Sequence, residues 1–142
     1  KEHVLHKLNG EIIDVIVEEP LGGSNNANTV SLLFGFNGIC RYILYTVFGM
    51  YPMKISVYES RKLFCHELVK ISYVTGEKKE TLSFPPEYRK EKKLYIWKKV
   101  CNLEPQIEWF YKRNSDNPRP MCFDMSDSYA VGFAGLKKLG IL

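Results

Sequence analysis

Two groups of acidic residues, far apart in the chain, could bind a divalent metal ion. Glu18 and Glu19 directly follow an apolar run, and Asp124 and Asp127 lie three residues apart near the end of the chain. Carboxylate oxygens are the ligands that Mg²⁺ and Mn²⁺ prefer. Two such ions about 4 Å apart could activate a water molecule and stabilise the leaving 3′ oxygen in phosphodiester hydrolysis. Together, the two groups favour a metal-dependent hydrolase site.

Each acidic group also has a structural interpretation. Glu18 and Glu19 could mark the surface where a buried strand emerges. Asp124, with Asp127 three residues on, is typical of a helix amino terminus, where an Asp caps free N–H groups and the helix dipole favours acids. Considered alone, each group fits these alternatives, and only the combination points to a metal.

The elements that must position these residues alternate between helix and strand. The apolar run is β-branched almost throughout, which is typical of a buried central strand. Pro105 should break or kink the helix that contains it. The order of elements indicates an α/β fold. Helices are predicted at residues 2–9, 29–49, 59–70, 94–111 and 125–139, and strands at residues 12–17 and 53–58.

Three stretches resemble motifs of the RuvC-type Holliday-junction resolvases, which belong to the RNase H-like superfamily, and phage-encoded members are the most similar. Residues 16–26 (IVEEPLGGSNN), with the long helix that follows, resemble the second motif of the family. Residues 57–64 (VYESRKLF) are similar to its strand that leads into a helix at a basic pair. Residues 123–134 (FDMSDSYAVGFA) resemble its terminal Asp-x-x-Asp helix, with Ser128 where the family commonly has Ala. The resemblance covers residues 3–139 in order.

The resemblance implies a three-layer, RNase H-like α/β fold, with a central mixed sheet flanked by helices, as a single domain over residues 1–142. It implies that Glu18, Asp124 and Asp127 are catalytic and hold two Mg²⁺ or Mn²⁺ ions, with Glu19 replacing Glu18 if the register shifts by one. The family begins with a strand that carries a metal-bridging Asp, followed by a hairpin. This chain starts at the first helix of the family, so we expect it to be incomplete at its N-terminal end.

A basic segment could contact DNA. Residues 78–99 contain eight Lys or Arg residues, with Tyr88, Tyr95 and Trp97 interleaved among them. Such a segment could bind phosphates without sequence preference and stack on bases, or it could be no more than a solvated face. Within it, residues 76–93 are predicted to be a polar basic insertion or loop. The candidate DNA-binding residues are Arg61, Lys62, Lys90, Lys92, Lys93 and Lys98.

Composition excludes several other classes of protein. The net charge of +4 permits an anionic partner. The four cysteines form no CxxC pair, so a structural zinc site is not expected, and reduced thiols indicate a cytosolic protein. No uninterrupted apolar run reaches the roughly 18 to 20 residues of a membrane span. Phosphate-binding loop, dinucleotide, zincin and serine-hydrolase motifs are absent from the sequence.

The sequence and the resemblance together predict a Mg²⁺-dependent endonuclease that resolves four-way DNA junctions in the cytoplasm of a bacterium or a phage-infected host cell. We expect a homodimer through the aromatic helix at residues 29–49. Two alternatives stay open. One is a non-catalytic RNase H-like module that binds nucleic acid, and the other is a different RNase H-like nuclease, acting on flaps or RNA–DNA hybrids.

Overall fold

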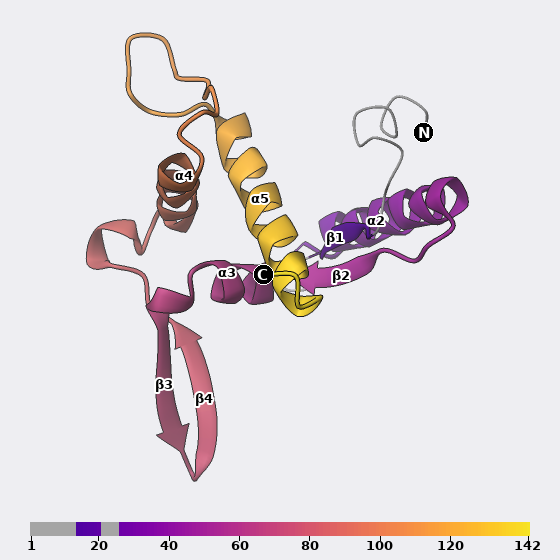
Figure 1. Ribbon diagram of the computed structural model, residues 1–142, viewed down its shortest axis with the longest axis horizontal. Coiled ribbons are helices and arrows are strands. Elements are labelled where there is room, and N and C mark those ends of the chain that lie inside the picture. Colours follow the sequence, from indigo (N-terminus) through magenta and orange to yellow (C-terminus); the bar gives the residue numbers. More distant parts are fainter. Residues whose placement is uncertain (1–13, 21–25) are drawn as a thin grey trace. The chain divides into compact units, whose positions relative to one another are not determined.

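The computed structural model describes residues 14–20 and 26–142, and the helix predicted at residues 2–9 lies outside them (Figure 1). One domain is expected from the sequence, whereas the contacts within the chain define two compact units that meet between Val57 and Tyr58. The described residues combine helices with short strands, as expected for an α/β chain.

The first unit is a βαβ arrangement. Strand β1 (Ile16–Glu19) pairs in parallel with β2 (Met53–Ser56), and helix α2 (Ala27–Phe48) lies between them in the sequence. A parallel pair needs such a crossover because its two strands run in the same direction. Glu18 and Glu19 are therefore part of β1, whereas the sequence analysis placed them after the strand. The described part of this strand is half-buried rather than fully buried.

Helix α2 begins and ends at well-defined caps. The Oδ1 atom of Asn26 accepts hydrogen bonds from the backbone N–H groups of Asn28 and Thr29, at 3.1 and 3.2 Å. The helix therefore begins at Ala27, two residues before the predicted start at residue 29. Gly49 ends the helix in the left-handed conformation, with φ of 74°, and its N–H donates to the carbonyl of Tyr45.

No side chain of α2 is buried, and many of its apolar side chains are exposed. By length and composition α2 could cross a membrane, and it is the one such helix among the residues described. The count of uninterrupted apolar residues did not single out this helix, because polar residues interrupt its apolar sequence. Core helices of soluble proteins and signal sequences meet the same criterion, so this finding alone does not show whether α2 lies in a membrane. The dimer contact expected through this helix stays a prediction.

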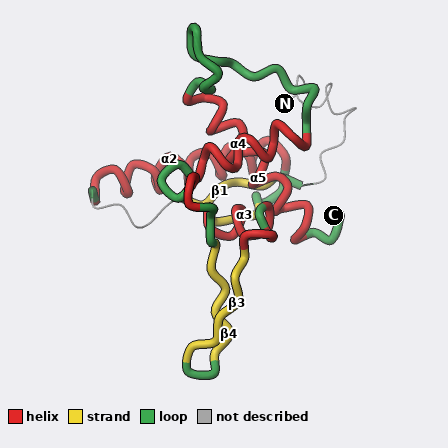
Figure 2. Tube along the Cα trace, turned by 90° about the vertical axis from the view of Figure 1, so that its left-hand side faces the viewer, coloured by secondary structure: helices red, strands yellow, loops and turns green. Residues whose placement is uncertain are grey.

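The second unit contains a hairpin that the sequence analysis missed. Strands β3 (Val69–Val74) and β4 (Glu77–Leu82) pair antiparallel through a two-residue turn. Thr75 and Gly76 both have positive φ, 51° and 85°, which matches the twist of a tight hairpin. In Figures 1 and 2 the hairpin projects away from the helices α4 and α5 of the same unit. Residues 76–93 are thus mostly ordered secondary structure, and the predicted helix at 59–70 ends early.

The remaining elements of this unit are helical. Helix α4 stops just before Pro105, because a residue that precedes proline disfavours the helical conformation. Helix α5 starts at a proline, which is well suited to the first helical position, five residues earlier than predicted. The helical elements are α3 (Val57–Phe64), the 3₁₀ turns η1 (His66–Leu68) and η2 (Pro86–Tyr88), α4 (Lys92–Leu103) and α5 (Pro120–Lys138).

The core of the second unit lies where α3, α4 and α5 meet. Phe64 is buried and packs edge-on against the rings of Tyr129 and Phe133, with centroids 5.8 and 5.3 Å away. The buried core residues are Phe64, Cys65, Ile96, Val100 and Ala130. Within the described ranges the strands form two separate two-stranded sheets, so a single central mixed sheet is not seen there.

Candidate functional site

Asp124 and Asp127 lie inside helix α5 and not at its start. The helix begins at Pro120, and its N-cap residue, Arg119, makes no capping bond through its side chain. The two aspartates are the fifth and eighth residues of the helix, beyond the first turn whose N–H groups need a cap. The capping interpretation was therefore wrong. Their spacing places both carboxylates on one face.

Asp127 forms the centre of an ion-pair cluster that joins three helices. The Nη2 atom of Arg61, from α3, lies 3.1 Å from its Oδ1 atom, and the Nζ atom of Lys93, from α4, lies 3.3 Å from its Oδ2 atom. The side chains of Arg61 and Asp127 are only 17% and 15% exposed. A charge pair with so little solvent access is held in place more strongly than a surface pair.

Asp124 is the exposed member of the same cluster. Its side chain is 76% exposed, and its Oδ1 atom lies 3.2 Å from the Nζ atom of Lys93. Burial by itself would lower the pKa of Lys93, but hydrogen bonds from this ammonium group to Asp124 and Asp127 outweigh that effect and raise it. Lys93 therefore bridges the two carboxylates as a cation, and the cluster contains two acids and two bases.

Glu18 and Glu19 belong to the first unit. The side chain of Glu18 is exposed, and its carbonyl oxygen accepts a hydrogen bond of 2.9 Å from the side-chain amide of Asn37. Glu19 pairs with Lys54 at 3.5 Å, and both side chains are close to half exposed. Adjacent strand residues point to opposite faces, so only one of these glutamates can face a given site.

The structure brings together two of the three expected metal ligands, Asp124 and Asp127, whereas Glu18 belongs to the other unit. In residues 14–20 and 26–142, no three His, Cys, Asp or Glu side chains form a group that could hold a metal ion. The two aspartates supply hard oxygen donors, which suit Mg²⁺ or Mn²⁺. At present both donors are neutralised by Arg61 and Lys93.

The predicted DNA-binding residues fall into different environments. Arg61 and Lys93 face Asp127, as described above. Lys62 pairs with Glu80 at 2.6 Å, and hydrogen bonds from Lys62 and Lys78 lower the pKa of Glu80 to about 2. The other three candidates are exposed: Lys98 donates to the hydroxyl of Tyr88, Lys92 lies over the ring of Phe84, and Lys90 lies in the turn before α4.

Sequence reasoning identified Arg61 and Lys93 as basic residues but missed their partner. Arg61 and Asp127 are 66 positions apart, so no local spacing relates them. The one available signal was the charge pattern itself, a basic pair in the last turn of α3 and a pair of acids in α5. The comparisons with known proteins supply no further signal, since no family model, curated protein or solved structure matches the chain.

Proposed function

We propose that this chain is an RNase H-like, RuvC-type endonuclease that hydrolyses DNA phosphodiesters with the help of divalent metal ions, and that a four-way junction is its substrate. One observation carries the proposal. Asp124 and Asp127, the two acids of the Asp-x-x-Asp motif, lie on one face of α5 with cationic side chains directly opposite them. Phosphodiester hydrolysis needs both kinds of group: carboxylates for the metal ions and cations for the phosphate.

The donor chemistry fits Mg²⁺ or Mn²⁺. Asp127 is mostly buried and fixed by Arg61, so one ligand is already oriented, while the exposed Asp124 can turn toward an ion. Asp124 and Asp127 would hold the metal, and Glu18 joins them on the strength of the sequence motif alone. When bound, the metal ions supply an activated water molecule and stabilise the leaving oxygen.

The two cationic residues have separate roles in this proposal. Arg61 positions Asp127, because its guanidinium group contacts both carboxylate oxygens, at 3.1 and 3.4 Å. Lys93 is half exposed and holds its carboxylates from the solvent side. With Asp124 and Asp127 holding a metal ion, its ammonium group would be available to a phosphate oxygen of the DNA. Lys93 is thus the candidate for contact with the cleaved strand.

The test is Mg²⁺-dependent cleavage of a labelled four-way junction, with duplex, flap and RNA–DNA hybrid substrates beside it. Asp127→Asn and Asp124→Asn should each reduce cleavage by about 100-fold or more, since even changes in the groups that support metal ligands cost about 10- to 100-fold. Asp116→Asn is the matched control, because Asp116 is an exposed acid in the loop before α5. It should leave cleavage unchanged.

Three outcomes distinguish the proposals. Symmetric nicking of the junction, lost in both aspartate variants and kept in the control, supports the resolvase. Cleavage of flaps or hybrids instead of the junction would support the metal site but overturn the proposed substrate. Full cleavage by both variants overturns the assigned site.

One observation favours a second candidate, a non-catalytic module that binds nucleic acid. Both aspartates already have cationic partners, so the cluster is complete as a structural ion-pair network. Such a module would bind the junction without metal and would cleave nothing. Its affinity would be the same with Asp124→Asn, and metal-independent binding of this kind, combined with no cleavage by the wild type, would establish it.

A further inference from the structure

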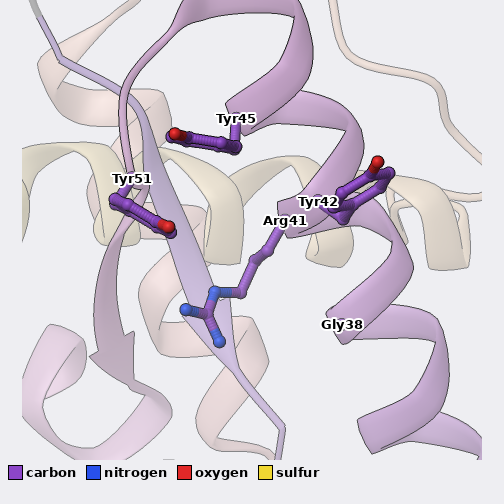
Figure 3. Close-up of a pocket in the computed structure, with 5 residues that line it drawn as sticks. All are labelled: Gly38, Arg41, Tyr42, Tyr45 and Tyr51. Atoms are coloured by element: carbon purple, nitrogen blue, oxygen red, sulfur yellow. The ribbon is translucent and has the colours of Figure 1, made fainter.

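A pocket of about 290 Å³ lies in the first unit. It is lined by Gly38, Arg41, Tyr42 and Tyr45 from the C-terminal half of α2, and by Tyr51 from the loop that follows the helix. Figure 3 shows the Arg41 side chain extended away from the helix, with Tyr45 and Tyr51 on one side of it and Tyr42 on the other. The lining therefore combines one cation with three aromatic rings.

Arg41 lacks an acceptor for one of its donors. It is the one charged residue in the 22 residues of α2. Its Nε atom is buried and has no hydrogen-bond partner among the described residues. A buried donor without a partner is costly, and a cationic one more so. Arg41 also lines the pocket, so its positive charge favours a ligand there with a phosphate or carboxylate.

The tyrosines provide flat apolar surfaces beside this cation. The rings of Tyr45 and Tyr51 are stacked, with centroids 4.3 Å apart and planes at 22°. Tyr42 and Tyr51 are among the exposed aromatic residues, so both side chains are largely open to solvent. Exposed aromatic rings beside a cation are the arrangement on which unpaired bases stack in proteins that bind single-stranded nucleic acid.

We propose that this pocket binds one unpaired nucleotide of a DNA strand, with the phosphate on Arg41 and the base against the tyrosines. The volume is at the lower end of ligand pockets, roughly 300 to 1,000 Å³, and is enough for one nucleotide but not for several. The exposed rings let the neighbouring nucleotides continue into solvent. The inference rests on the proposed function, of which it names a part of the substrate, the unpaired nucleotides at a branch.

The test measures binding and not cleavage, so it is independent of the metal site. Fluorescence anisotropy follows a labelled oligothymidylate binding to the full chain in EDTA, over a series of salt concentrations. Arg41→Gln should lower the slope of log affinity against log salt by about 0.7, the value for one phosphate contact on a single strand. Tyr51→Leu should weaken binding by about fivefold or more without a change in slope, since it removes only stacking.

Three controls define the interpretation. Tyr51→Phe keeps the ring and should bind as the wild type does. Arg113→Gln removes an equal charge from an exposed loop of the second unit and should keep the slope. An oligonucleotide of abasic sites should bind the wild type and Tyr51→Leu equally, because it has no base to stack.

Wild-type binding by folded Arg41→Gln and Tyr51→Leu would overturn the pocket assignment, and so would an equal loss of slope in Arg113→Gln. If Arg41→Gln does not fold, as judged by circular dichroism, Tyr51→Leu and the abasic strand still decide, because Tyr51 is exposed outside α2. If the pocket proposal is wrong, junction cleavage should still depend on Asp127. If the cleavage proposal is wrong, the pocket variants should still bind the oligonucleotide less tightly. The two proposals are therefore tested separately.

Discussion

The Nη2 atom of Arg61 donates to both carboxylate oxygens of Asp127, at 3.1 and 3.4 Å, and this contact joins α3 to α5 beside the core of the second unit. Both side chains are largely shielded from water, whereas Lys93, the second cation at Asp127, is half exposed. The two ion pairs thus differ mainly in solvent access, and this difference makes their contributions to stability separable.

Arg61→Met should therefore destabilise the protein by about 2 kcal/mol, because it leaves a shielded carboxylate without its main partner. Lys93→Met should cost no more than about 1 kcal/mol, since exposed pairs contribute little. Urea unfolding measures both. The double variant Arg61→Met/Asp127→Leu should recover part of the loss. Equal costs for the two single variants would contradict the assigned difference in burial.

A metal ion at Asp124 and Asp127 should bind more tightly when Lys93 is removed, even though the loss of Lys93 costs a little stability. Lys93→Ala removes a positive charge about 3 Å from both aspartates. Even in water-like surroundings such a charge costs a divalent ion at least about 1 kcal/mol, so Mn²⁺ should bind about fivefold to tenfold more tightly. Broadening of the NMR signals of residues near Asp124 by Mn²⁺ measures the affinity. Unchanged affinity in Lys93→Ala, or broadening elsewhere, would count against a metal at this pair.

Two glycines of the α2 segment should respond to alanine in opposite directions. Gly49 has φ of 74°, where an L side chain is strained, so Gly49→Ala should destabilise by about 1 kcal/mol. Gly35 lies inside the helix, and a methyl group there would meet no atom within 4 Å. Gly35→Ala should stabilise by about 0.5 to 1 kcal/mol. Thermal unfolding of both variants checks the signs, and a stabilising Gly49→Ala would mean that the helix does not end there.

The thiol of Cys65 should be inert in the folded protein. Cys65 is fully buried, and burial raises its pKa from 9.0 to about 11. A group whose pKa is raised on folding stabilises the protein fully below its unfolded pKa. That contribution is lost as the pH rises from about 9 through about 11. Alkylation with iodoacetamide at pH 8, followed by mass spectrometry, should label the partly exposed Cys40 first and Cys65 only after unfolding.

The hairpin shows how local sequence patterns can be outweighed. Residues 59–70 have a helical stripe of apolar residues, yet the helix stops at Phe64 and the chain continues into a strand. The alternation from Val69 to Val74 was the missed signal, together with the Thr75-Gly76 turn. Pairing with β4 satisfies the backbone groups of both strands, and that gain depends on a partner strand that lies further along the chain.

The sequence by itself determined the features that depend on neighbours along the chain. These are the long helix up to Gly49, the end of α4 before Pro105, and the placement of Asp124 and Asp127 on one helical face. Helical periodicity, caps and proline act within a few residues, so they can be recognised in the sequence. The tertiary structure alone decided which cations face the two aspartates. That depends on how α3 and α4 pack against α5, and packing joins residues whose separation in the sequence carries no signal.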